Sequence, residues 1–360
     1  PGGARADVTV VAPNDELVYR PLAIGEPFGR PLLRRYALDA ICRDLGATLR
    51  KDRLRAVEGR HAALGSGARL PFDVLVVAVG AIAEPALPNV FTFFADRDPS
   101  EFQWILRELE DGTVRSIAFV VPPGNGWALP AYELALQSAR YAASVDVGDI
   151  ALTLVTPEDA PLAIFQGAGS EAVARLLGRA DIAVEASAYA HDYDGRTLHL
   201  APGDRRLVVD RVAALPRLRG PAIAGLPSDP EGFVRVDEHG RVPGLDRVYA
   251  VGDATTFPIK QGGLAAQEAN VVAALIAGAP PEGAEPIFAR PRLRAVLLTG
   301  AEPLFLTATI TGGESVASTA SHECPWSPPT KVVAEHLAPF LVDRPARTIG
   351  DGPAHAEQAL

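Results

Sequence analysis

The chain has 360 residues, of which 48% are hydrophobic and 22% charged, and its formal net charge is −10. This composition predicts a folded protein with apolar cores and excludes a disordered chain. Because the chain is acidic and has no basic stripe, we expect no nucleic-acid partner. No apolar run reaches the roughly 20 residues that a membrane-spanning helix needs, so any membrane contact would be peripheral.

The two cysteines, Cys42 and Cys324, lie far apart and form neither a CxxC pair nor a metal-ligand spacing. We therefore expect no metal site, and a reducing, cytoplasmic location. The N-terminal residues lack the charged and apolar regions of a secretory signal.

The first third of the chain alternates β-branched apolar runs with helical patterns. In chain order the patterns predict a strand at 7–12, a loop at 12–23, a helix at 31–49, short strands between 54 and 70, a buried strand at 72–79 and a helix at 99–110.

A strand-helix-strand pattern begins after residue 112 and is followed by alternating strands. The expected elements are a strand at 117–121, a turn at 122–127, helices at 129–143 and 171–178, a strand at 150–156, further strands over 181–215 and a crossing segment at 220–230.

The last third of the chain contains a short strand-turn-helix segment and a tail. We expect a hairpin within 232–247, a strand at 248–251, a helix at 263–277, a strand pair at 295–298 and 304–310, an amphipathic helix at 331–341 and a mobile end at 342–360. Strands that alternate with helices favour α/β architecture with parallel sheets.

The segment from Arg247 to Asn270 carries the clearest chemical signal. Its strand stops at Gly252-Asp253, where the backbone can approach a ligand closely and a carboxylate is offered to it. Gly262-Gly263 then opens a helix, and the N–H groups and dipole of a helix N-terminus favour negative charge. Such an arrangement suits a long ligand with hydroxyl groups at one place and an electron-rich ring at another.

This segment resembles the second FAD motif of flavoproteins with two dinucleotide domains. Together with the strand end at residues 79–81 and the segment PPGNGWALPAYELAL, it extends the resemblance over nearly the whole chain. The chain resembles the FAD-dependent pyridine nucleotide-disulfide oxidoreductase superfamily. The loop VYRPLA and the tail PWSPPTK are most similar to its branch of type II NADH dehydrogenases and sulfide:quinone oxidoreductases.

The resemblance implies a glutathione-reductase-like α/β fold with two Rossmann-like dinucleotide-binding domains, the second inserted in the first, and a small C-terminal α+β region. The FAD-binding domain would be residues 1–112 and 223–290, the NAD-like domain 113–222 and the C-terminal region 291–360. The first strand and glycine-rich loop of such an FAD-binding domain are missing from the sequence. Either they lie outside these residues or the protein binds FAD poorly.

The resemblance also implies which residues contact FAD. Asp253 would accept hydrogen bonds from the ribityl chain, and Gly252 would allow its close approach. The other implied cofactor-binding residues are Val79, Gly80, Ala81, Arg20, Pro21, Lys260, Gln261, Gly262 and Gly263. The alternatives are a plain turn at Gly80, a surface charge at Arg20 and a solvated side chain at Lys260.

The second dinucleotide motif is irregular. We expect Gly124 and Gly126 near a second nucleotide, but Trp127 and Ala128 stand where an NADH site prefers small residues. Glu158 lies where an acid that binds ribose would lie, which keeps NAD(P)H open as a second ligand. Trp127 also replaces an essential cysteine of the sulfide:quinone branch, so we do not expect a cysteine-bound polysulfide route.

The resemblance implies an enzyme that passes electrons from a soluble small-molecule donor, NAD(P)H or similar, through FAD to a quinone or another acceptor. Trp326 would lie on the acceptor side or serve only as packing. The alternatives are a flavoprotein with a non-nicotinamide donor such as a sulfur compound, and a degenerate, non-catalytic nucleotide-binding module. A homodimer and peripheral contact with the inner face of the membrane stay open, and no catalytic residue is predicted.

Overall fold

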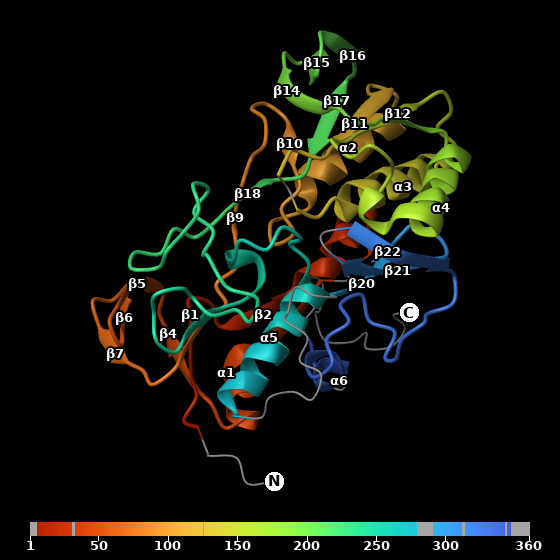
Figure 1. Ribbon diagram of the computed structural model, residues 1–360. Coiled ribbons are helices and arrows are strands. Elements are labelled where there is room, and N and C mark those ends of the chain that lie inside the picture. Colours follow the sequence, from red (N-terminus) through yellow and green to blue (C-terminus); the bar gives the residue numbers. More distant parts are fainter. Residues whose placement is uncertain are drawn as a thin grey trace.

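The computed structural model describes residues 6–30, 33–124, 126–278, 291–311, 314–342 and 344–346. The protein is a mixed α/β structure with an upper part built on a parallel sheet and a lower part of shorter strands and helices (Figure 1). Within the described ranges, no helix combines the length and apolarity that a membrane crossing requires. The same ranges contain no group of three or more side chains arranged to hold a metal ion.

The upper part is centred on a five-stranded parallel sheet with the order β10-β17-β11-β12-β13. Its strands are β10 (Phe91–Thr92), β11 (Ser116–Val120), β12 (Ala151–Val155), β13 (Ile182–Glu185) and β17 (Arg211–Ala214). The helices of this part are α2 (Ser100–Glu110), α3 (Leu129–Ser144) and α4 (Gln166–Arg179), with the short 3-10 helix η2 (Ala163–Phe165) before α4.

The central strand β11 is buried on both faces, and its residues alternate between two cores. Ile117 and Phe119 pack with the buried residues of α2 and α3. Ala118 and Val120 pack instead with an antiparallel sheet on the opposite face. That sheet consists of β14 (Tyr189–Tyr193), β15 (Thr197–Ala201) and β16 (Arg205–Val208). Because both faces are covered, the strand reads as a continuous apolar run.

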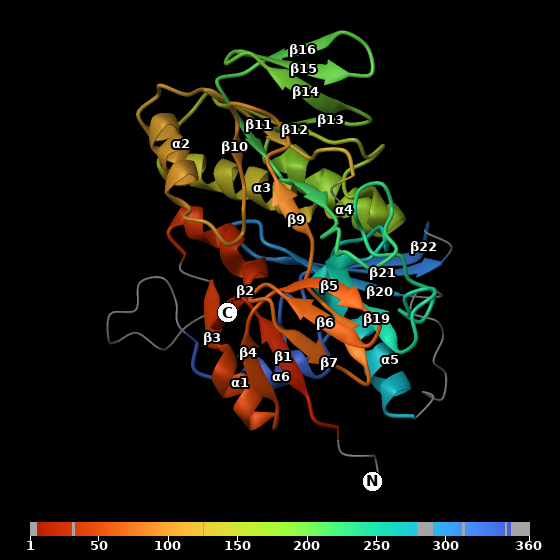
Figure 2. The same ribbon diagram turned by 90° about the vertical axis from the view of Figure 1, so that its left-hand side faces the viewer.

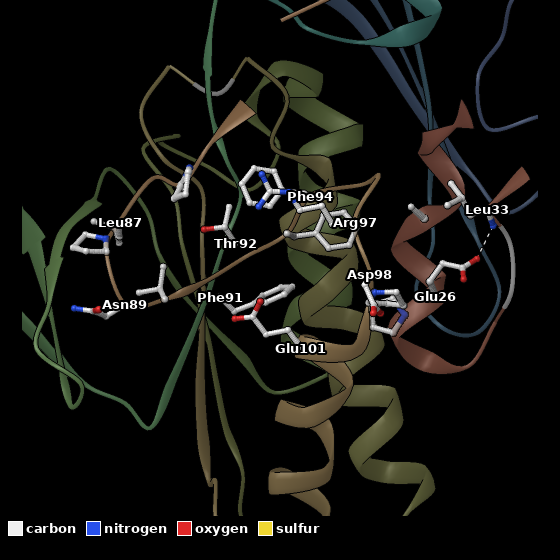
Figure 3. A pocket seen from close by; sticks show the side chains of 17 residues that line it. Glu26, Leu33, Leu87, Asn89, Phe91, Thr92, Phe94, Arg97, Asp98 and Glu101 are labelled. Atoms are coloured by element: carbon white, nitrogen blue, oxygen red, sulfur yellow. Dashed lines mark hydrogen bonds between the residues drawn. The ribbon is translucent and has the colours of Figure 1, made fainter. Parts of the chain in front are cut away.

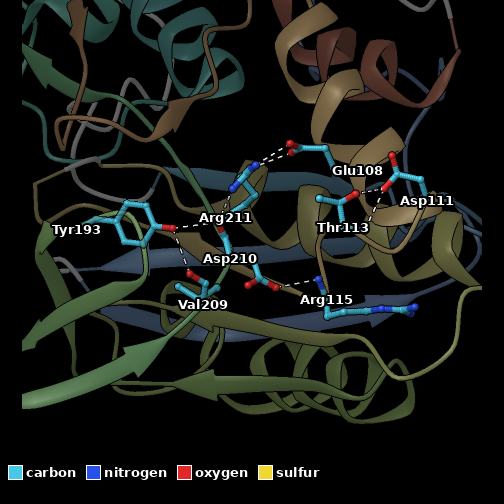
Figure 4. A network of polar contacts seen from close by, with 8 residues as sticks. All are labelled: Glu108, Asp111, Thr113, Arg115, Tyr193, Val209, Asp210 and Arg211. Atoms are coloured by element: carbon cyan, nitrogen blue, oxygen red, sulfur yellow. Dashed lines mark hydrogen bonds and ion pairs between the residues drawn. The ribbon is translucent and has the colours of Figure 1, made fainter.

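A polar network fixes the start of β11 to β17 and α2 (Figure 4). The Asp210 carboxylate accepts hydrogen bonds from the backbone N–H groups of Arg115 (2.8 Å) and Ser116 (2.9 Å) and from the Ser116 hydroxyl (2.9 Å). Arg211 donates two hydrogen bonds to Glu108, at 2.8 and 2.6 Å. These contacts set the register of the parallel sheet at its N-terminal edge.

The lower part contains two separate parallel pairs, β1 (Thr9–Ala12) with β4 (Thr48–Lys51) and β8 (Leu75–Val77) with β19 (Val248–Ala250). Neither pair joins another strand within the described residues. Their apolar side chains are covered unevenly, since Val76 is 41% exposed whereas Val77 and Val248 are 1% exposed.

Antiparallel sheets complete the lower part and the tail. Their strands are β2 (Glu16–Tyr19) with β3 (Arg34–Ala37), β5 (Leu54–Glu58) with β6 (His61–Leu64) and β7 (Arg69–Pro71), β9 (Ile82–Glu84) with β18 (Arg217–Arg219), and β20 (Arg292–Leu297) with β21 (Leu304–Thr311) and β22 (Glu314–Ser321). The remaining helices are η1 (Arg20–Phe28), α1 (Leu38–Asp44), η3 (Gly252–Ala254), α5 (Gly262–Ile276) and α6 (Leu337–Val342).

Two of these sheets connect the upper and lower parts. The two crossings of the chain between the parts run side by side as β9 and β18. The sheet β20–β22 lies between α4 above and α5 below (Figure 2), and both helices contact it.

Most expected elements are present, and several are shorter than predicted. The strands expected at 117–121, 150–156 and 248–251 and the helices expected at 99–110, 129–143 and 263–277 are confirmed within two residues at each end. The strand pair predicted for the tail is confirmed and has a third member, β22, that the sequence did not reveal. Of the end predicted to be mobile, residues 343 and 347–360 lie outside the described residues.

Three local predictions are wrong. The loop expected at 12–23 contains β2 and the start of η1, and the helix expected at 31–49 is only α1, flanked by β3 and β4. The helical spacing of apolar residues is overridden because residues 34–37 pair with β2 and residues 48–51 pair with β1. The helix expected at 331–341 is reduced to α6, since the backbone before it is held by contacts described below.

Asp210→Asn tests the network at the start of β11. The backbone N–H groups that bind Asp210 hold its pKa below the ordinary value. A lowered carboxyl pKa stabilises the fold above the unfolded pKa, and the contribution is lost as pH falls through the folded pKa. We expect Asp210→Asn to lower the free energy of unfolding by about 1 kcal/mol at pH 7.

The deficit of Asp210→Asn should start to shrink below about pH 4, where the carboxyl of the unfolded chain takes up its proton, and should be lost as the pH falls further through the lower folded pKa. Urea unfolding at several pH values measures this. Asp204→Asn is the matched control because Asp204 is an exposed acid that pairs with the exposed Arg206. A deficit in Asp210→Asn that does not change with pH would contradict the assignment.

Candidate functional site

The strand β19 ends in a turn that needs glycine for two reasons. The Val251 N–H donates to the Val77 carbonyl at 3.0 Å, which carries the pairing with β8 to the strand end. Gly252 then adopts φ +71°, in the left-handed region that glycine tolerates without strain. A Cβ on Gly252 would lie 3.2 Å from the Cβ of Ala265, so α5 packs directly against the turn.

Asp253, the next residue, presents a desolvated carboxylate. Burial raises its pKa, and the positive charges of Lys260 and Arg20 oppose that rise. Asp253 is half-buried, and in the described part of the chain no donor makes a hydrogen bond to its carboxylate. A half-buried acceptor without a protein donor is available to a ligand that carries hydroxyl groups.

Lys260 lies beside this turn and is only 9% exposed, so the alternative of a solvated side chain is wrong. Its Nζ lies 4.0 Å from the centroid of the Phe233 ring and donates a hydrogen bond to the Thr255 carbonyl. Burial lowers its pKa, while Asp253 and Glu268 hold the charged form. The structure therefore gathers one lysine and two acids around the turn.

The start of α5 faces the C-terminal tail. The Gln261 side chain caps the helix by accepting from the Leu264 N–H at 2.8 Å, and its amide donates to the Arg294 carbonyl at 3.0 Å. A Cβ on Gly262 would lie 3.4 Å from Val332. The N–H groups of this first turn precede the intrahelical hydrogen bonds and can serve a ligand.

The other residues predicted to contact flavin lie around the same edge. Val79, Gly80 and Ala81 follow β8, which is parallel to β19, so both strands end at one edge. Gly80 has φ +75°, and Val79 is 51% exposed. Arg20 opens η1 with Pro21 and forms an ion pair with Asp96 at 3.2 Å, while its charge also acts on Asp253.

The turn after β11 packs against this site. Gly126 has φ +76°, and a Cβ there would lie 2.7 Å from the Pro258 carbonyl oxygen. The Lys260 N–H donates to the Gly126 carbonyl at 3.2 Å. Gly124 lies on the same turn with φ +72°. The predicted second-nucleotide turn thus touches the loop that leads into α5.

Glu158, the predicted ribose-binding acid, accepts hydrogen bonds from other residues of the protein. Its Oε2 accepts hydrogen bonds from Tyr132 at 2.7 Å and from Thr156 at 2.8 Å. The Leu162 N–H donates to the same Tyr132 hydroxyl at 3.0 Å. Burial raises the pKa of Glu158. These contacts hold the loop after β12 against α3.

Sequence reasoning missed a buried ion pair. Lys331 Nζ lies 2.6 and 2.7 Å from the two carboxylate oxygens of Glu133, and the side chains are 8% and 1% exposed. The Leu298 N–H donates to the same carboxylate at 2.8 Å. The sign of this ion pair in the sequence is Glu133, a lone acid among the apolar residues of α3.

The tail around this pair is held at two further points. The Val332 N–H donates to the Tyr19 hydroxyl at 2.8 Å. The Trp326 ring packs edge-to-face on Phe305 with centroids 5.4 Å apart, and its Nε1 donates to the Thr330 carbonyl at 3.0 Å. Trp326 is thus part of the packing of the tail, and its predicted place on the acceptor side stays a prediction.

A hollow of about 330 Å³ lies away from the glycine turn, between η1, the segment 85–99 and the start of α2. Thr92, Arg97 and Glu101 are among its lining residues (Figure 3). Thr92 is 8% exposed, and its hydroxyl has no hydrogen-bond partner among the described residues. Glu26, Arg97, Asp98 and Glu101 also line the hollow, but none of the residues predicted to contact flavin does.

A strand-end glycine turn with a buried acid, next to a helix that starts with glycines, is the arrangement of a dinucleotide-binding oxidoreductase. The chain belongs to the pyridine nucleotide-disulphide oxidoreductase family, whose model matches residues 40–273. The resemblance to this superfamily is thereby confirmed.

One individual relative matches more than half of this chain. The alternative NAD(P)H-ubiquinone oxidoreductase C1, chloroplastic/mitochondrial, of Arabidopsis thaliana is 28% identical over 246 residues. The match covers 60% of this chain and 46% of the plant protein, so the chain spans less than half the length of that relative.

Two solved structures share the fold. The sulfide:quinone oxidoreductase of Aquifex aeolicus matches with a TM-score of 0.75 and 17% identity, over 98% of this chain and 94% of its own. The ferredoxin reductase for the CYP199A2 system of Rhodopseudomonas palustris matches with a TM-score of 0.58 and 20% identity, over 85% and 77%.

Lys331→Met should leave Glu133 as an unpaired buried acid. We expect a loss of about 3–5 kcal/mol in the free energy of unfolding, because the carboxylate keeps its desolvation cost and loses its partner. The double variant Glu133→Gln with Lys331→Met should recover most of that loss, since the Gln carbonyl still accepts from Leu298. Urea unfolding of the variants measures both effects, and equal losses in the single and double variants would contradict the pairing.

Thr92→Val tests the hydroxyl without a partner. A buried hydroxyl that makes no hydrogen bond costs about 1–3 kcal/mol, so the valine variant should be as stable as the wild type or more stable. The midpoint of thermal unfolding measures the change. A clear loss of stability would mean that a ligand or water satisfies the hydroxyl.

Proposed function

We propose that the protein is an FAD-dependent oxidoreductase that passes electrons from a small soluble donor through flavin to a quinone. The observation that carries the proposal is the desolvated Asp253 carboxylate, which lacks a protein donor at a glycine turn. Family membership and the names of the relatives support the same class of reaction.

The residues around the turn fit this cofactor. FAD would supply the redox centre that accepts electrons from the donor and delivers them to the acceptor. Asp253 would accept hydrogen bonds from ribityl hydroxyls, and Gly252 leaves room for their approach. The first N–H groups of α5 would stabilise negative charge on the pyrimidine side of the ring. Val79, Gly80, Arg20 and Pro21 would line the cofactor from the neighbouring elements.

The tail would shield this site from water. Val332 lies over the first glycine of α5 and is fixed by the Tyr19 hydroxyl. The adjacent Lys331 is neutralised by Glu133, so the covering segment brings no uncompensated charge to the site. Water exclusion strengthens the electrostatic contacts that a charged redox state makes with the protein.

The donor belongs to one of two classes. NAD(P)H is supported by the name of the plant relative and by the two left-handed glycines of the turn after β11. A non-nicotinamide donor, such as a sulfur compound, is supported by Glu158, whose Oε2 already accepts from Tyr132 and Thr156. Peripheral membrane contact, which suits a lipid-soluble quinone, is supported by the exposed apolar residues Leu337 and Val342 of α6.

A spectroscopic titration tests the proposal and separates the donors. Purified protein should bind FAD and show flavin absorption. Anaerobic addition of NADH, NADPH or sulfide should bleach that absorption with one donor class only, and a soluble quinone should restore it. Protein that stays colourless with excess FAD would refute the proposal.

Asp253→Asn should weaken FAD binding by about tenfold or more, because a hydrogen bond to a charged acceptor contributes about 1.5–3 kcal/mol. The variant without FAD should be no less stable than the wild type, since burial disfavours the charge on Asp253. Quenching of flavin fluorescence and thermal unfolding measure the two effects. Asp246→Asn, at an exposed acid just before β19, is the control and should change neither.

A further inference from the structure

Glu268 lies beneath the glycine turn and has no role in the function proposed above. It belongs to α5, is 3% exposed, and its Oε2 accepts the Gly252 N–H at 2.5 Å. This N–H group belongs to the backbone of the same turn that carries Asp253. The position of the turn relative to α5 therefore depends on this carboxyl group.

The charges around Glu268 do not balance. Lys260 attracts it and Asp253 repels it, so the buried Glu268 and the half-buried Asp253 share one buried lysine. Lys260 also faces Asp229 and Glu231, and Asp253 also faces Arg20. The strand β20 packs against α5 and carries Arg292 and Arg294.

The protonation of Glu268 changes near neutral pH. Burial raises its pKa to about 7, whereas the Gly252 N–H and Lys260 act in the opposite direction. Both states are therefore populated under physiological conditions. The charged state binds the Gly252 N–H more strongly, because hydrogen bonds to ionised acceptors are the stronger ones.

We propose that Glu268 is the positioning residue of the Gly252–Asp253 turn and that it takes up a proton when a flavin covers the turn. The second half of this statement rests on the proposed function. A bound ring would remove solvent from the cluster of Asp253, Lys260 and Glu268, which disfavours its unbalanced negative charge. Binding that takes up a proton becomes tighter as pH falls.

The first experiment needs no cofactor. A carboxyl group whose pKa is raised by folding binds more protons in the folded state, so the folded state loses stability as pH rises between the unfolded and folded values. For Glu268 this pH range runs from 4.5 to about 7. Within it, the ratio of folded to unfolded protein falls by at most tenfold for each pH unit.

Thermal and urea unfolding of the full chain at pH 5, 6, 7 and 8 would measure this dependence. Glu268→Gln keeps an acceptor for Gly252 but cannot titrate, so it should lack that part of the pH slope. Glu268→Ala should lack the slope and also be less stable at every pH. Glu335→Gln, at an exposed acid that contacts Asn270 on α5, should keep the wild-type slope. An unchanged slope in Glu268→Gln would overturn the proposal.

The second experiment measures FAD affinity by fluorescence quenching at pH 6 and pH 8. We expect wild type and Glu335→Gln to bind FAD about three- to tenfold more tightly at pH 6, and Glu268→Gln to bind equally at both values. Equal pH dependence in all three proteins would overturn the proton uptake.

If no protein binds FAD at either pH, the proposed function fails, and with it the claim that Glu268 takes up a proton when a flavin binds. The unfolding slopes still decide the role of Glu268 in the turn.

Discussion

The buried ion pair between Glu133 and Lys331 is the contact on which the arrangement of the site depends. It joins the first turns of α3 to a tail segment 198 residues further along the chain. The next tail residue, Val332, covers the start of α5 and is held by Tyr19. Three regions that are distant in sequence are thereby fixed around one helix N-terminus. Since a buried pair is costly unless its geometry is good, the short contacts and the added Leu298 donor are essential to it.

The candidate site concentrates desolvated charge, and this is its main physical property. Lys260 and Glu268 are buried and Asp253 is half-buried, and this burial, only partly offset by the attraction between the lysine and the two acids, moves the pKa of each group toward its neutral form. Such pKa shifts are common where ligands bind or where protons are transferred. The hollow lined by Thr92 contains none of the residues predicted to contact flavin, so the presence of a hollow is by itself a poor guide to the candidate site.

The sequence predicted those features that depend on neighbouring residues. The strand, glycine turn and helix between 247 and 270 could be predicted because each is encoded by a short pattern of apolar residues and glycines. The helix at 31–49 was wrong because pairing with distant strands outweighed local spacing. The partners of Lys331, Glu158 and Glu268 could not be predicted, since residues far apart in sequence or on different elements meet only in the folded chain.

Gly126 has a consequence for motion within the molecule. Its carbonyl binds the Lys260 N–H, and the missing side chain lets the backbone near Pro258 pass at contact distance. A hinge motion between the upper sheet and the loop before α5 would have to break this hydrogen bond and this backbone contact. The turn after β11 is therefore tied to the loop before α5, and a ligand that shifts this turn would displace Lys260 directly. The turn after β11 and the Gly252–Asp253 turn could then influence each other without a large closure of the upper part upon the lower part.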